Sequence, residues 1–228
     1  LLTSSYNYRD HRKILIIDGK TAYNGGVNLA DEYININSRF GHWKDSAVRI
    51  KGPAVRSYTV MFLQMWLAAS KEDPEQQKEL LEYASGEAEP FKEAGGFVIP
   101  YADSPLDGNK VGEMVYMDII NTAEQYVHIT SPYLIPDDEL KASLCFAARR
   151  GTDVKLILPG IPDKKAVYAL AKSYYKELLE AGVRIYEYTP GFIHAKNFVS
   201  DGKKAVVGTI NLDYRSLYHH FECATYMS

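Results

Sequence analysis

A short pattern of polar residues occurs twice in this chain of 228 residues, and it constrains the fold more than any other feature. The copies span residues 11–18 and 194–201, and both read H-x-K-x-x-x-x-D. Each continues through six residues into a glycine turn that ends in asparagine. His11 to Asn28 and His194 to Asn211 therefore have the same spacing of seventeen residues. This repetition predicts an internal duplication in which two halves share one chemistry.

The duplication extends beyond the motifs, with an offset of 183 residues. After a gap, Asp45 aligns with Glu222, and each carboxylate opens a predicted strand. About 80 residues of strands and helices are predicted before the second motif, whereas ten residues precede the first. We therefore expect the first half to be truncated, without its opening strands and helices.

Composition narrows the possible classes of protein. The chain is 46% hydrophobic and 24% charged, as is ordinary for a globular protein. Its net charge of -3 gives no global basic field, so no nucleic-acid partner is expected. Cys145 and Cys223 form neither a disulfide framework nor a zinc site, and we expect two buried thiols. No apolar run of about 18 residues is present, so no membrane span is expected in this sequence.

Strands and helices alternate in the second half, which predicts the α/β class with a mainly parallel mixed sheet flanked by helices. The first half begins with a predicted buried strand over residues 11–18, and residues 53–70 predict a helix. Its apolar residues predict a core or interface helix, with a lipid-facing surface as the alternative. In the second half, strands are predicted at 127–131, 154–158 and 183–188, and helices at 111–122, 136–150 and 164–181.

The predicted architecture is two lobes related by a pseudo-twofold axis. Residues 1–70 form the C-terminal part of the first lobe, and residues 97–228 form the second. Between them, residues 71–96 hold eight acids and three lysines and are broken by proline and glycine, which predicts an acidic linker that is partly helical.

The motif residues suit an anionic substrate. His11 and Lys13 are two residues apart, so on a strand they project to one face, and His194 and Lys196 repeat this arrangement. Lysine supplies positive charge, and histidine transfers protons or acts as a nucleophile near neutral pH. Two pairs brought together would surround one phosphodiester. Further phosphate contacts are expected from the turns, at Asn28, Asn211, Gly25, Gly208 and Thr209.

Each histidine also requires a group that holds its tautomer, and Asp45 and Glu222 are the matched candidates. Asp18 and Asp201 fall on the opposite strand face, so we expect structural roles for them. A single H-x-K pair would be an accident of a surface strand, but its repetition excludes that interpretation. No metal-binding motif accompanies the pairs, so no metal and no cofactor are expected.

These residues resemble the signature of the phospholipase D superfamily. The flanking segments at 25–33, 131–136, 191–196 and 211–216 are similar to those of bacterial cardiolipin synthases. The resemblance implies phosphatidyl transfer between two phosphatidylglycerol molecules through a phosphohistidine, without a metal. It assigns His11 as nucleophile and His194 as acid and base. Gly26 and Thr209 depart from the serine that many members carry.

The resemblance also implies partners and a location. Phosphatidylglycerol, other anionic phospholipids and a membrane surface are the expected partners. The expected location is the cell membrane of a bacterium, with the catalytic part cytoplasmic or peripheral and the anchor outside this chain. Two alternatives remain open: a phosphodiesterase or nuclease of the same superfamily, and a non-catalytic fragment that binds anionic lipids.

Overall fold

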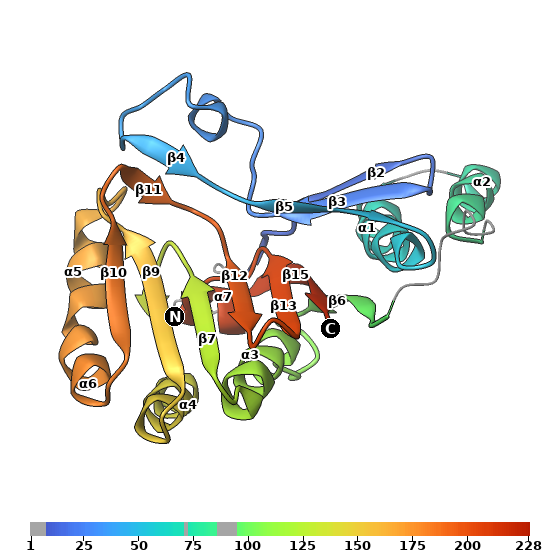
Figure 1. The fold of residues 1–228 in the computed structure, drawn as a ribbon. Coiled ribbons are helices and arrows are strands. Elements are labelled where there is room, and N and C mark those ends of the chain that lie inside the picture. Colours follow the sequence, from blue (N-terminus) through green and yellow to red (C-terminus); the bar gives the residue numbers. More distant parts are fainter. Residues whose placement is uncertain (1–7, 71–72, 86–94) are drawn as a thin grey trace, which may run out of the picture.

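The computed structural model describes residues 8–70, 73–85 and 95–228. Its centre is an eight-stranded sheet, which Figure 1 shows beside the smaller sheet of the first half. Along the sheet the order is β1 (Arg9–Asp10), β15 (His220–Met227), β13 (Lys204–Gly208), β12 (Asn197–Ser200), β7 (Tyr126–Thr130), β9 (Asp153–Pro159) and β10 (Arg184–Tyr188), and β6 (Val98–Asp103) also pairs with β15.

The central sheet is mixed, and it confirms the predicted α/β class. Parallel pairing joins β7, β9 and β10 at one side and β1 to β15 at the other. Antiparallel pairing joins β7, β12, β13, β15 and β6 between them. This antiparallel part arises because the second motif runs directly into a hairpin of β12 and β13, where no helix intervenes.

Helices cover the central sheet and enclose the main core. Tyr116 stacks on Phe198 of β12 with ring centroids 3.8 Å apart, and both side chains are buried. The predicted helix at 164–181 is two helices, because it breaks at Tyr174 after Ser173 bonds back to the carbonyl of Leu170. The helices are α3 (Val111–Thr122), α4 (Asp138–Arg149), α5 (Lys165–Ser173), α6 (Tyr175–Glu180) and α7 (Tyr214–Tyr218).

The first half forms a three-stranded sheet that lies against β13 and β15. Its strands are β2 (Ile14–Ile17), β3 (Thr21–Gly25) and β5 (Ala47–Lys51), followed by α1 (Val55–Ala69) and α2 (Pro74–Ser85). Of the predicted linker at 71–96, residues 71–72 and 86–94 lie outside the described residues. None of the described helices is long and apolar enough to cross a bilayer.

Two predictions for the first half are wrong in detail. The strand predicted over residues 11–18 begins only at Ile14, and it is not buried, since Leu15 is 57% exposed. The helix α1 buries Tyr58 and Leu63. On the face that its apolar pattern predicts to be covered, Met61 is buried, whereas Phe62 and Trp66 stack on each other and stay half exposed. In both cases the apolar pattern identified the element but not the side that is covered.

Two short parallel strand pairs connect the halves and position the site. β1 pairs with the start of β15, and β4 (His42–Lys44) pairs with β11 (Gly191–Ile193). Each pairing ends in an equivalent backbone hydrogen bond. The amide of His11 donates to Phe221 at 2.9 Å, and that of His194 donates to Lys44 at 2.7 Å. Each histidine therefore lies beside the residue that comes after its backbone partner, which is Glu222 for His11 and Asp45 for His194.

The repeated aspartates differ although their backbones match. Asp18 and Asp201 both adopt the left-handed conformation, with φ of 53° and 55°. The carboxylate of Asp201 accepts hydrogen bonds at 2.8–2.9 Å from the amides of residues 124, 125 and 126, so it joins the end of α3 to β7. Asp18 is exposed. These contacts support the structural role predicted for Asp201.

The two aspartates provide a matched test of this contact. We expect Asp201→Ala to lower the free energy of unfolding by about 2 kcal/mol more than Asp18→Ala, because charge-assisted bonds to three amides are lost. Backbone strain in the left-handed region is similar in both variants and cancels. Denaturant titration of the two proteins gives the difference, and equal stabilities would contradict this role for Asp201.

Candidate active site

Two histidine–carboxylate pairs form the centre of the candidate site, and each pair joins the two halves. His11 Nδ1 lies 3.0 Å from both carboxylate oxygens of Glu222. His194 Nδ1 lies 2.7 Å from Asp45 Oδ2. The pairing is crossed, because each histidine bonds to the carboxylate that follows the other motif. The four residues that the sequence singled out therefore come together, in an arrangement that the alignment alone did not specify.

The short strand pairs explain the crossing. Parallel pairing places the end of β1 beside the start of β15, so His11 emerges next to Glu222. The pairing of β4 with β11 does the same for Asp45 and His194. The histidines and lysines thus lie in links beside strands, rather than within the strands that the sequence predicted.

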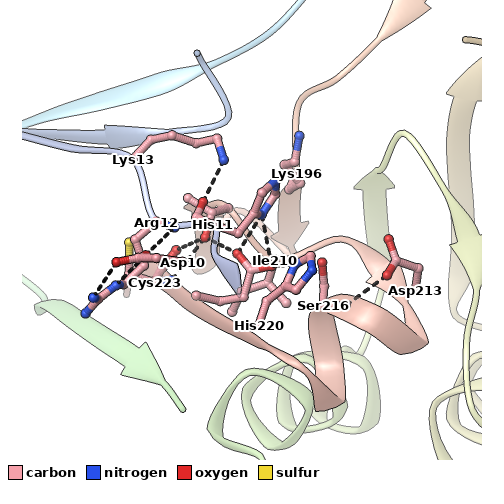
Figure 2. A network of polar contacts seen from close by, with 12 residues as sticks. Asp10, His11, Arg12, Lys13, Lys196, Ile210, Asp213, Ser216, His220 and Cys223 are labelled. Carbon is pink, nitrogen blue, oxygen red and sulfur yellow. Dashed lines mark hydrogen bonds and ion pairs between the residues drawn. The ribbon is translucent and has the colours of Figure 1, made fainter. Parts of the chain in front are cut away.

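Both motif lysines lie within the same electrostatic environment. Lys196 is 1% exposed, and its Nζ lies 3.0 Å from His194 Nε2. Lys13 donates to the backbone oxygen of His11 at 2.6 Å, as Figure 2 shows. Burial lowers the pKa of Lys196 to about 7, and the charge of Lys13 contributes to this shift. Two cations so close together favour an anionic ligand between them.

Charge is distributed unevenly between the two pairs. Although burial alone would raise the pKa of Glu222, hydrogen bonds from His11 and His220 lower it to about 2. Glu222 is therefore ionised at neutral pH. Burial, together with the neighbouring Lys196, lowers the pKa of His194 to about 4, so this imidazole is uncharged at neutral pH.

The turn residues take different positions in the two halves. Asn211 is buried, and its Oδ1 has no hydrogen-bond partner within the described chain. Asn28 donates to the Tyr33 hydroxyl, and the Tyr33 ring contacts His194 edge-on at 5.2 Å. A Cβ on Gly25 or Gly208 would lie within 2.3 Å of the neighbouring strand, so both glycines permit close strand pairing.

Gly26 and Thr209 occupy equivalent positions beside the two carboxylates. The Thr209 hydroxyl donates to Glu222 Oε2. A Cβ on Gly26 would lie 2.2 Å from Asp45 Oδ1, so Asp45 fills the space that a side chain would need. Because glycine stands at position 26 where many members carry serine, Asp45 lacks a hydroxyl donor of the kind that Glu222 receives from Thr209.

Two aromatic rings at the site escaped the sequence analysis. Trp43 packs on His194 with ring centroids 5.4 Å apart, and His220 packs on His11 at 5.2 Å. Each lies two residues before the carboxylate of its pair. The alignment of Asp45 with Glu222 contained this signal, because it places Trp43 opposite His220.

Potential metal ligands also lie at the site. His11, His220 and Glu222 offer three ligand atoms within 4.8 Å of one another. Both imidazole Nδ1 atoms, however, already bond to the Glu222 carboxylate. We therefore interpret this group as a hydrogen-bonded set rather than as metal ligands. The chemistry that the site supports is attack by an imidazole on an anionic centre held by two lysines.

Comparisons with known proteins agree with this geometry. Residues 116–228 match the family described as "Cardiolipin synthase, PLD-like domain". An uncharacterized protein of Streptococcus mutans is 62% identical over 99% of this chain and 48% of its own length. A cardiolipin synthase of Geobacillus sp. (strain WCH70) is 40% identical over 99% of this chain and 44% of its own length. The chain thus spans less than half the length of these relatives.

A solved structure shares the fold. The crystal structure of phosphatidylserine synthase from Haemophilus influenzae superposes with a TM-score of 0.67 at 17% identity, covering 99% of this chain and 59% of that one. At this identity the likeness concerns the arrangement of strands and helices.

The lowered pKa of His194 predicts a pH-dependent stability. Between pH 6.5 and 4 the unfolded chain protonates this histidine and the folded chain does not, so stability falls as the pH falls. We expect this group to remove up to about 3 kcal/mol across that range. In His194→Gln the contribution should vanish, while other groups such as Glu113 titrate as before. Unfolding free energies measured at several pH values test this, and identical pH slopes would contradict it.

Proposed function

Because this chain belongs to the phospholipase D superfamily, among proteins similar to bacterial cardiolipin synthases, we propose that it transfers a phosphatidyl group between two phosphatidylglycerol molecules. The products are cardiolipin and glycerol. The observation that carries the proposal is the crossed pair of histidine–carboxylate contacts beside two buried or half-buried lysines. This arrangement offers a nucleophile, a proton carrier and charge stabilisation for one phosphodiester.

In the first step, His11 Nε2 attacks the phosphorus of phosphatidylglycerol. A P–N bond forms, the P–O bond to glycerol breaks, and the leaving oxygen takes a proton from His194. Lys13 and Lys196 stabilise the charge on the phosphoryl oxygens, with Asn28 and Asn211 as further contacts. The product of this step is a phosphatidyl-histidine with free glycerol.

In the second step, His194 takes the proton from a glycerol hydroxyl of a second phosphatidylglycerol. That oxygen attacks the phosphorus, a P–O bond forms and the P–N bond breaks. Cardiolipin leaves, and His11 is restored. Thus His194 acts first as an acid and then as a base, and no net proton is gained or lost.

Exposure supports this order of the two histidines. The His11 side chain is 24% exposed and that of His194 is 9% exposed, so a lipid phosphate reaches His11 more easily. Lys196 also lies against Nε2 of His194 and obstructs attack from that ring. A bound phosphate would offset the positive charge of Lys196, which favours protonation of His194 before the leaving group departs.

The proposed substrates place the reaction at a lipid surface. Phosphatidylglycerol and other anionic phospholipids reside in a bilayer, so we propose that the chain works at the cell membrane of a bacterium, from the cytoplasm or as a peripheral part. The Asp45 and Glu222 partners hold the imidazoles there without a metal or cofactor.

Two other activities use the same residues. Hydrolysis would replace the second lipid with water, as in a phosphodiesterase, and a nuclease would accept a nucleic-acid phosphodiester. A net charge of -3 disfavours the nuclease, because nucleic-acid binding draws on a basic surface. A non-catalytic fragment would bind anionic lipids without turnover.

Incubation of the purified chain with labelled phosphatidylglycerol in mixed micelles separates these activities. Cardiolipin with free glycerol supports the transferase, and an acid-labile phosphoprotein supports the histidine intermediate. Phosphatidic acid alone indicates hydrolysis. A folded chain that binds the lipid but forms no product would contradict the proposed activity for this chain.

Removal of either imidazole tests the two-histidine mechanism. We expect His11→Ala and His194→Ala each to lower turnover by at least about 1,000-fold, because the nucleophile or the proton carrier is lost. Lipid binding should persist, since both lysines remain. Turnover by lipid chromatography and binding by vesicle sedimentation give the comparison. Full turnover in both variants would refute the mechanism.

Chelation tests the expected independence from metals. We expect activity to survive excess EDTA, because two lysines supply the positive charge that a divalent ion provides in other phosphoryl-transfer enzymes. The measurement is cardiolipin formation with and without the chelator. Loss of activity that one divalent ion restores would overturn this expectation and direct attention to the His11, His220 and Glu222 set.

A further inference from the structure

A third imidazole lies at the site, and the proposed mechanism does not use it. His220 Nδ1 lies 3.3 Å from Glu222 Oε1, the same oxygen that His11 contacts at 3.0 Å. The His220 side chain is 10% exposed. Its Nε2 is buried and has no hydrogen-bond partner in the part of the chain that the structure describes. The ring therefore reaches the site through its Nδ1 contact with Glu222. Figure 2 shows His220 in the polar network that also contains His11.

The duplicated halves differ at this position. Trp43 is the counterpart of His220, and its ring packs on His194 much as His220 packs on His11. The Trp43 indole has no hydrogen-bonding atom at the place of His220 Nδ1. Asp45 Oδ1 instead accepts a hydrogen bond at 2.8 Å from the backbone amide of Ser46. Only the Glu222 pair therefore combines an imidazole neighbour with a hydroxyl neighbour among the described residues.

The extra donors change what Glu222 does to His11. A carboxylate with several hydrogen-bond donors is a weaker base than one with a single donor. Glu222 receives His11, His220 and the Thr209 hydroxyl. Donors therefore meet both carboxylate oxygens of Glu222 and fix its orientation. The fixed carboxylate in turn orients the His11 ring through Nδ1.

We propose that His220 is a positioning residue for His11: by donating its Nδ1–H to Glu222 it holds the carboxylate in place, and this keeps the His11 proton on Nδ1 and the electron pair on Nε2. The inference rests on the proposed function, in which Nε2 of His11 attacks phosphorus. It also explains how duplicated halves acquire different roles, since His194 has tryptophan at the equivalent place.

The charged groups that face His220 come from several elements. Glu222 lies on its own strand, and His11 lies in the link after β1. On the other side, a partly open pocket of about 100 Å³ is lined by Asp103 of β6, Lys110 before α3 and Tyr218 of α7, together with His220. A pocket of this size with charged side chains in its wall admits water, and its acidic and basic groups are unchanged in the variants below.

Substitution of His220 separates positioning from packing. His220→Phe keeps a ring and removes both nitrogens, whereas His220→Asn keeps an N–H donor near the Nδ1 position. His219→Phe is the matched control, because the neighbouring ring packs on Tyr8 and Tyr214. We expect His220→Phe to lower kcat about tenfold and to lower the share of His11 in the Nδ1–H tautomer, with KM little changed. His220→Asn should restore most of both, and His219→Phe should resemble the parent.

A second measurement decides the proposal without turnover. Long-range proton–nitrogen NMR spectra report the tautomer and charge of His11. We expect the Nδ1–H tautomer of His11 in the parent chain, a mixture of tautomers in His220→Phe, and a return to Nδ1–H in His220→Asn. An unchanged tautomer and an unchanged kcat in His220→Phe would overturn the positioning role. If the parent shows no turnover, the proposed function fails, while the NMR spectra still test the positioning role.

Discussion

The crossed hydrogen bonds between histidine and carboxylate are the interaction on which the rest of the site depends. Each joins one half of the chain to the other, and each is set by a short parallel strand pair. The pairing is local in space but spans 149 residues for one pair and 211 for the other. A change that separates the halves therefore disrupts both pairs together. The site is a property of the interface between the halves.

Burial of charge is the second constraint. Glu222 and Lys196 are both buried, and isolated charges in such places are strongly unfavourable. The structure compensates Glu222 with imidazole and hydroxyl donors. The charge of Lys196 is compensated only in part, as its lowered pKa of about 7 indicates. An anionic ligand would complete the compensation. In the proposed function, a bound phosphate would therefore draw part of its binding affinity from relieving this lysine.

Much of the site could be predicted from the sequence because the duplication acts as an internal alignment. The motif histidines, the lysines and the matched carboxylates all came from spacing, and α3, β7, β9 and β10 came from apolar periodicity. The crossing could not be predicted, since it depends on pairing between segments far apart in the chain. His220 and Trp43 lie outside the motif. Leu15 is exposed because no other part of the described chain packs on that side of its strand, and the helix breaks at Tyr174 because of local hydrogen bonding. Apolar periodicity reports neither of these effects.

The crossed arrangement has a consequence for how such a site can originate. A single half with one motif would have a histidine without its carboxylate and a carboxylate without its histidine. Two identical copies related by a twofold axis would satisfy each other, so the ancestral unit of such a site would be a homodimer. Fusion of the two copies then releases each from symmetry. In this chain the two halves differ at two such places: Gly26 is the counterpart of Thr209, and Trp43 is the counterpart of His220.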